Sequence, residues 1–76
     1  MKKDTYKTRD LAESSFLIAK GKNLRLIERE GKICWFIFDD KEICEQIAND
    51  FWFGDSIASA KAFYDAMQTL KNRIFA

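Results

Sequence analysis

Residues 23–38, NLRLIEREGKICWFIF, decide the fold of this chain. Two runs rich in aliphatic and aromatic residues, 23–30 and 32–38, lie on either side of a glycine. This arrangement is typical of two strands joined by a tight turn. We therefore predict a β-hairpin whose turn is Glu30-Gly31, so that Arg29 lies opposite Lys32.

Both faces of the predicted hairpin are apolar. Successive side chains of a strand point to opposite faces, so one face receives the set Leu24, Leu26, Ile33, Trp35 and Ile37. The other face receives the set Ile27, Cys34, Phe36 and Phe38, beside Arg25 and Arg29. A sheet with one solvated face normally alternates between apolar and polar residues. Either helices cover both faces, or one face meets another molecule.

The segments before the hairpin predict a strand and a helix. Residues 5–8 form a short β-prone run, which we interpret as a first strand. Residues 9–20 have helical spacing of apolar side chains, and Asp10 with Glu13 has the spacing of a capping box. Residues 1–4 are expected to be disordered.

Two further helices are predicted after the hairpin. Apolar residues recur at helical spacing from a cap at Asp39 or Asp40 to about residue 50, and again from a cap at Asp55 or Ser56 to Ile74. The order is β-α-β-β-α-α. We expect one α+β domain over residues 1–76, with a small antiparallel sheet packed against three helices.

Composition argues against catalytic and metal sites. The 76 residues include no histidine and only two cysteines, Cys34 and Cys44, without a metal-binding spacing. We expect both cysteines to be buried and unpaired, as in a reducing cytoplasm. No signal peptide and no apolar run of about 20 residues is recognisable. The sequence predicts no catalytic residue, metal ligand, cofactor, small-molecule substrate or membrane contact.

The charge distribution leaves nucleic-acid binding open as an alternative function. Residues 1–32 carry nine Lys/Arg and five Asp/Glu, whereas residues 33–76 carry four and seven. Basic side chains beside an aromatic ring on a sheet can hold a nucleic-acid strand by phosphate contacts and stacking. The candidate residues gather around the hairpin: Lys20, Lys22, Arg25, Arg29 and Lys32. A solvated charged rim explains the same residues.

Five aromatic residues are candidates for a protein interface. A chain of this length has little material to cover two apolar faces, and tryptophan is enriched at binding hot spots. Trp52 and Phe53 lie between two predicted helices, where they either plug the corner of the core or anchor a partner. The candidates are Trp35, Phe36, Phe38, Trp52 and Phe53.

Four segments resemble an uncharacterised family of small domains that recur in tailed-phage, prophage and related bacterial genomes. They are Tyr6-Lys7-Thr8-Arg9-Asp10-Leu11, Ala19-Lys20-Gly21, Ile27-Glu28-Arg29 and Phe36-Ile37-Phe38-Asp39. The resemblance covers nearly the whole chain and implies a phage or bacterial setting, but no activity. We therefore expect a non-enzymatic accessory protein in the bacterial cytoplasm that binds another protein or itself, with a homodimer favoured.

Overall fold

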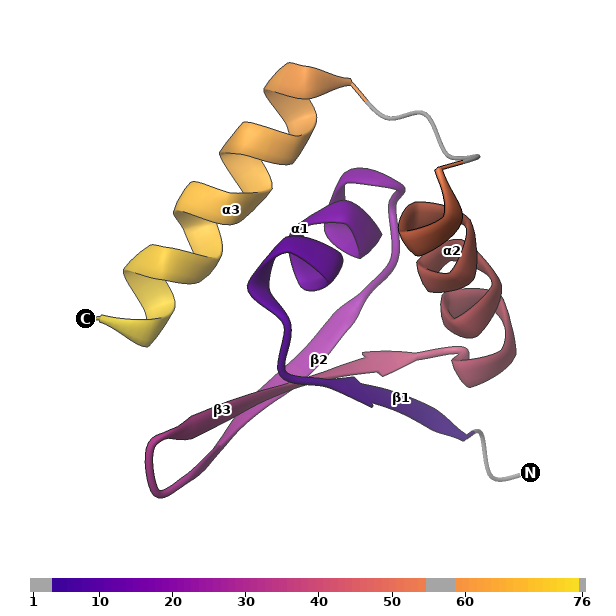
Figure 1. The fold of residues 1–76 in the computed structure, drawn as a ribbon. Helices are drawn as coiled ribbons and strands as arrows, with labels where there is room; N and C mark the ends of the chain where they lie inside the picture. Colours follow the sequence, from indigo (N-terminus) through magenta and orange to yellow (C-terminus); the bar gives the residue numbers. More distant parts are fainter. Residues whose placement is uncertain (1–3, 55–58, 76) are drawn as a thin grey trace.

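The computed structural model describes residues 4–54 and 59–75 and shows the predicted α+β fold (Figure 1). A three-stranded antiparallel sheet has the strand order β1-β3-β2. The predicted disorder of residues 1–4 concerns residues outside this description, apart from Asp4. The elements are β1 (Thr5–Thr8), α1 (Leu11–Ala19), β2 (Leu24–Glu30), β3 (Ile33–Asp39), α2 (Lys41–Phe53) and α3 (Ala60–Ile74).

The hairpin forms as predicted, but its turn lies one residue further along the chain. Glu30 pairs with Ile33 and Arg29 with Cys34, so the turn is Gly31-Lys32 rather than Glu30-Gly31. Gly31 has φ 63°, a left-handed conformation that a glycine adopts without a Cβ penalty. The partner of Arg29 shifts by two residues, and a shift of two leaves every side chain of β3 on its predicted face.

A β-bulge near the start of β2 corrects the prediction for Leu24. Leu24 pairs with Phe38 and Leu26 with Ile37, so Arg25 is an extra residue in β2. The bulge interrupts the two-residue alternation. Leu24 therefore shares a face with Phe38 rather than with Leu26.

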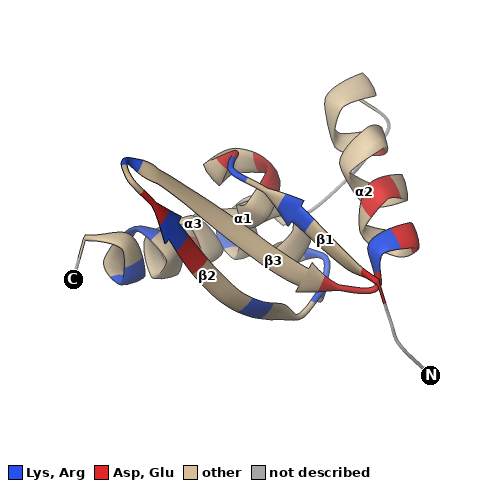
Figure 2. Cartoon of the chain, turned by 90° about the horizontal axis from the view of Figure 1, so that it is seen from below, with Lys and Arg blue, Asp and Glu red and all other residues tan. Residues whose placement is uncertain are grey.

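The three helices lie on one side of the sheet (Figure 1). The view from below shows the strands in front with no helix over them (Figure 2). The shortest dimension of the molecule is 19 Å, which accommodates one sheet and one layer of helices. The core between these layers is centred on Leu17, Phe36, Phe38, Cys44 and Leu70. The sequence left open whether helices cover both faces of the sheet. The described helices cover only one face.

Asp10 and Asp40 begin their helices in different ways. Asp10 has an extended backbone, and its Oδ1 accepts a hydrogen bond from the Glu13 amide at 2.8 Å, as predicted. Asp40 is the residue before α2, but its φ is 62° and its side chain makes no capping hydrogen bond. Only the first of the two aspartates is therefore a side-chain cap.

The last helix begins later than predicted. Ser59 is its cap, and its hydroxyl oxygen accepts a hydrogen bond from the Ala62 amide at 3.3 Å. The predicted caps Asp55 and Ser56 lie outside the described residues. Arg29 donates a hydrogen bond to the carbonyl oxygen of Ile74, which satisfies a carbonyl at the other end of α3.

We expect Asp10→Ala to lower the free energy of unfolding by about 1 kcal/mol, because it removes a working cap. Asp40→Gly is the matched variant, since glycine accepts the left-handed backbone and no capping bond is lost. We expect Asp40→Gly to stay within about 0.5 kcal/mol of the parent, because relief of the left-handed strain offsets the added freedom of the unfolded chain. Urea denaturation measures both, and equal losses would contradict this assignment of the caps.

Candidate functional site

The face of the sheet turned away from the helices is the first candidate surface. Its centre is β3, with β1 and β2 on either side (Figure 2). The pairing places Lys7 beside Ile37, Ile37 beside Leu26, and Trp35 beside Glu28. We call this surface the open face and define it by Lys7, Leu26, Glu28, Glu30, Ile33, Trp35 and Ile37.

Polar side chains hold Trp35 on the open face. The Lys7 Nζ lies 4.9 Å from the centroid of the Trp35 ring and 3.7 Å from the Glu28 carboxylate. The Trp35 indole N–H donates a hydrogen bond to Glu30 at 3.1 Å. Leu26 nearby is 42% exposed, whereas Trp35 and Ile33 are half-buried and Ile37 is only 9% exposed. The open face therefore presents an ordered apolar centre with a charged rim.

Two predicted interface residues lie in the core instead. Phe36 and Phe38 are 1% and 0% exposed on the helix side of β3. Sequence alternation placed them on one face but did not show which face the helices cover. Since neither side chain reaches solvent, both are withdrawn from the candidate surface, whereas Trp35 remains on it.

The aromatic residues at the end of α2 divide between core and surface. The ring centroid of Phe51 lies 5.0 Å from that of Phe16 and 5.2 Å from that of Trp52. Phe51 therefore fills the corner of the core. Trp52 and Phe53 are 57% and 76% exposed. Trp52 and Phe53 are thus the last residues of α2 rather than residues between two helices, and their role as partner anchors stays a prediction.

Glu13 forms a polar site that the sequence did not predict. Its carboxylate accepts hydrogen bonds from the Tyr6 hydroxyl at 2.8 Å and from the Trp52 indole N–H at 2.6 Å. The residue is only 6% exposed. The spacing from Asp10 suggested a side chain turned back to the helix end, but the carboxylate links β1, α1 and α2. No local pattern reveals these partners, because Tyr6 is seven and Trp52 thirty-nine residues away.

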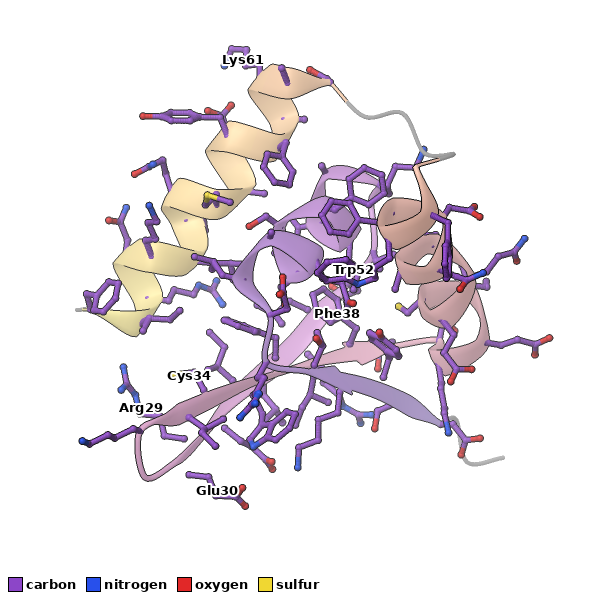
Figure 3. All side chains as sticks on the ribbon, viewed as in Figure 1. Arg29, Glu30, Cys34, Phe38, Trp52 and Lys61 are labelled. Atoms are coloured by element: carbon purple, nitrogen blue, oxygen red, sulfur yellow. The ribbon has the colours of Figure 1, made fainter. Side chains whose placement is uncertain are left out.

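A pocket lies beside the Glu13 carboxylate on the helix side of the molecule, where Trp52 lies between α1 and α2 (Figure 3). Its α2 residues recur at a spacing of three or four, which places them on one side of that helix. We call it the Glu13 pocket, and its lining is Tyr6, Glu13, Glu45, Gln46, Ala48, Asn49 and Trp52.

Burial and negative charge raise two pKa values near this pocket. The pKa of Tyr6 lies far above its usual value, chiefly because of burial, and further because of the hydrogen bond to Glu13 and the charges of Glu13 and Glu45. Burial also raises the pKa of Cys44, whose thiol donates to the Asp39 carbonyl at 3.2 Å. Both cysteines are free; Cys44 is buried and Cys34 is half-buried.

The five predicted nucleic-acid contacts lie on different elements of the chain. Arg25 makes an ion pair with Asp39 at 3.5 Å. Arg29 reaches the end of α3, as described above, and Lys32 lies in the turn. About 20 Å of strand separates the two ends of β2. Lys20 and Lys22 lie at the end of α1 and in the following loop.

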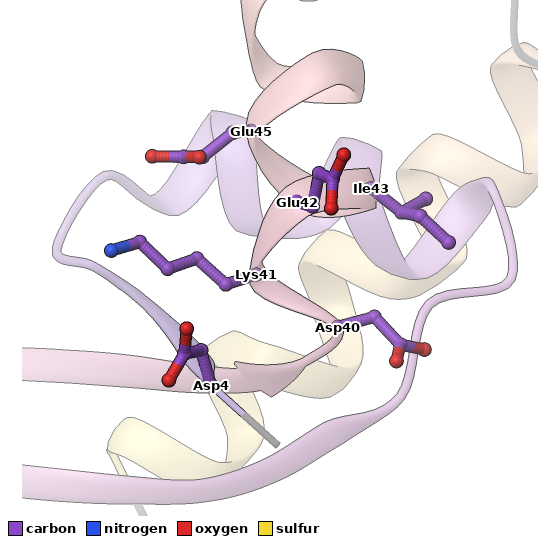
Figure 4. Close-up of a pocket in the computed structure, with 6 residues that line it drawn as sticks. All are labelled: Asp4, Asp40, Lys41, Glu42, Ile43 and Glu45. Atoms are coloured by element: carbon purple, nitrogen blue, oxygen red, sulfur yellow. The ribbon is translucent and has the colours of Figure 1, made fainter. Parts of the chain in front are cut away.

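A second pocket at the start of α2 is acidic (Figure 4). Asp4, Asp40, Glu42 and Glu45 line it together with Lys41 and Ile43. The carboxylates point in different directions rather than toward one centre (Figure 4). Within residues 4–54 and 59–75, no group of three or more His, Cys, Asp or Glu residues has a geometry that could hold a metal ion.

Comparison with known families gives a match over nearly the whole chain. A family model described as a domain of unknown function matches residues 3–76. The chain belongs to this family, DUF5659. The match agrees with the predicted membership of an uncharacterised family of small domains. Searches of the curated proteins and of the solved structures found no match to this DUF5659 chain.

The helices of the DUF5659 chain were compared with the length and hydropathy of membrane-spanning helices. Among residues 4–54 and 59–75, none of the helices has both the length and the apolar character needed to span a bilayer.

We expect the stability of the DUF5659 domain to fall as the pH rises above about 9 to 10. The raised pKa values of Tyr6 and Cys44 mean that the folded chain holds these protons more tightly than the unfolded chain does. The contribution of these two groups to the free energy of unfolding is complete below their ordinary pKa values, 10.0 for Tyr6 and 9.0 for Cys44. It is lost as the pH rises toward their pKa values in the folded chain. The urea midpoint followed against pH measures this loss.

Tyr6→Phe and Cys44→Ala are the controls for this pH dependence. Each variant lacks one titrating group, so the fall of its midpoint with pH should be shallower than that of the parent. Slopes identical to the parent in both variants would show that other groups cause the alkaline loss.

Proposed function

We propose that this chain is a non-enzymatic protein-interaction module that self-associates through the open face of its sheet. The observation that carries the proposal is the one-sided arrangement of the helices, which leaves the exposed Leu26 and the half-buried Trp35 and Ile33 without a second layer. A chain of 76 residues buries only a modest share of its surface, and small domains of this size often gain stability from a partner subunit.

The composition of the open face resembles a protein interface. Its centre contains Trp35, Leu26 and Ile33, and charged side chains surround them. Interfaces combine an apolar centre, often with an aromatic anchor, and a polar rim. The contacts from Lys7 and Glu30 hold the Trp35 ring in place before any partner binds, which reduces the entropy lost on association.

The charges of the open face suit a second copy of the same chain. Lys7 lies on β1 at one side of β3, and Glu28 and Glu30 lie on β2 at the other side. A two-fold axis parallel to β3 places β1 of one copy over β2 of the other. Lys7, which lies 3.7 Å from the Glu28 carboxylate of its own chain, then also approaches Glu28 of the partner subunit, and the reciprocal contact forms at the same time. Packed sheets with nearly aligned strands have this geometry.

The setting we propose is the cytoplasm of a bacterial host, in which the chain is a phage or prophage accessory protein. The support is the resemblance in the segments around Tyr6–Leu11 and Phe36–Asp39. Two unpaired cysteines fit a reducing compartment. In this proposal the chain acts through binding alone.

We expect the parent chain to sediment as a dimer, at twice its mass of 8.9 kDa, and Leu26→Lys to shift it to monomer. An ammonium group at the apolar centre should raise the dissociation constant at least about tenfold, because the charge loses its water in the interface. Sedimentation equilibrium over a range of concentrations measures this. The fold should persist, because Leu26 is already partly exposed on an edge strand.

Two controls make this experiment specific. Tyr64→Lys adds the same group at an exposed position on α3 and should leave the dimer intact. Lys7→Glu should weaken the dimer, and Lys7→Glu with Glu28→Lys should restore it, since the swap renews the complementary charges. A parent chain that is monomeric at all concentrations, or a Leu26→Lys variant that still dimerises, would refute the proposal.

The alternative, nucleic-acid binding, predicts affinity that falls steeply as salt rises. We expect no binding, because Phe36 is buried and the five basic residues are dispersed. Fluorescence anisotropy with labelled single-stranded and double-stranded DNA at low salt tests this. Saturable binding that is weakened by Lys22→Ala or Lys32→Ala would revive the alternative.

A further inference from the structure

We propose that the Glu13 pocket binds the guanidinium group of an arginine side chain supplied by a partner protein. The pocket lies between α2, β1 and the first turn of α1, on the opposite side of the sheet from the open face. The two surfaces can therefore be occupied independently, and this inference does not depend on self-association.

The pocket offers hydrogen-bond acceptors in excess of its own donors. Each oxygen of the Glu13 carboxylate accepts one hydrogen bond, from Tyr6 or from Trp52. A carboxylate oxygen has about two acceptor positions, so each oxygen can accept another donor. Glu45 and the side-chain carbonyls of Gln46 and Asn49 add further acceptors. A guanidinium carries five N–H donors and no acceptor, which matches this set.

The charge of the pocket also favours a cation. Among residues 4–54 and 59–75, neither a lysine nor an arginine lines the pocket, and none of the ion pairs involves Glu13. Within this part of the chain, the Glu13 carboxylate, in a residue that is 6% exposed, has lost water and has neutral donors but no counter-charge. Burial is the main cause of the raised pKa of Tyr6, and the negative charges of Glu13 and Glu45 raise it further.

Trp52 selects arginine over lysine. Its indole N–H is bound to Glu13, so the ring is held in place at the pocket while remaining more than half exposed. A planar guanidinium stacks on an aromatic ring and forms paired bonds to a carboxylate, whereas an ammonium is a compact and strongly hydrated charge. A carboxylate and a tryptophan at one site suit the planar group.

The test is an NMR titration with N-acetyl-arginine amide as the probe. The Trp35→Phe variant retains one indole, so its indole N–H signal reports on Trp52 alone. We expect a saturable shift of this signal. N-acetyl-citrulline amide is the matched ligand, because it has nearly the same shape without the charge, and it should produce no saturable shift.

Glu13→Gln tests the residue at the base of the pocket. It should weaken binding of the arginine probe about tenfold, because a hydrogen bond to a charged group is lost. If Glu13→Gln does not fold, Glu45→Gln at an exposed position of the same pocket should still weaken binding severalfold. The monomer-directed variant Leu26→Lys should bind the probe as the parent does, which separates this inference from the proposed dimer.

Three results would overturn the inference. The first is the absence of a saturable shift with the arginine probe. The second is an equal response to citrulline, which would show that charge is irrelevant. The third is unchanged affinity in a folded Glu13→Gln variant, or in Glu45→Gln where Glu13→Gln does not fold, which would place the probe elsewhere.

Discussion

The burial of one side of β3 is the constraint on which the rest of the structure depends. Phe36 and Phe38 project from this central strand and are closed off by Leu17, Cys44 and Leu70 from three helices. Loss of this contact would expose two phenylalanines and undo the only core of the described residues. Since all three described helices pack against this side of the sheet, none of them covers the opposite side. The open face is thus a consequence of how a short chain forms one good core.

Much of this fold could be predicted from residues 23–38, because alternation is a local property. The run from Ile33 to Phe38 indicated a strand with two apolar sides, and the turn shift did not exchange those sides. The side that the helices cover could not be predicted, because it depends on how α1 and α2 pack across the sheet. For this reason Phe36 and Phe38 were assigned to a surface, and no glycine or proline marks the bulge that turns Leu24 inward.

The candidate site shows the same division between local and tertiary information. The spacing between Asp10 and Glu13 predicts that Asp10 caps α1. The hydrogen bond from the Glu13 amide to the Asp10 carboxylate confirms this prediction. The Glu13 side chain instead binds Tyr6 and Trp52, partners that only the assembled fold brings near. A buried carboxylate shared by three elements gives a precise geometry at a cost in desolvation.

β1 connects the two candidate surfaces, although it has only four residues. Tyr6 points to the helix side and donates to Glu13, whereas its neighbour Lys7 points to the open face and contacts Trp35. Alternation along a single edge strand thus assigns one residue to each surface. The contacts of Tyr6 and Lys7 lie on opposite sides of the sheet and share no partner residue. The short strand therefore contributes to both surfaces, while each surface can be occupied without the other.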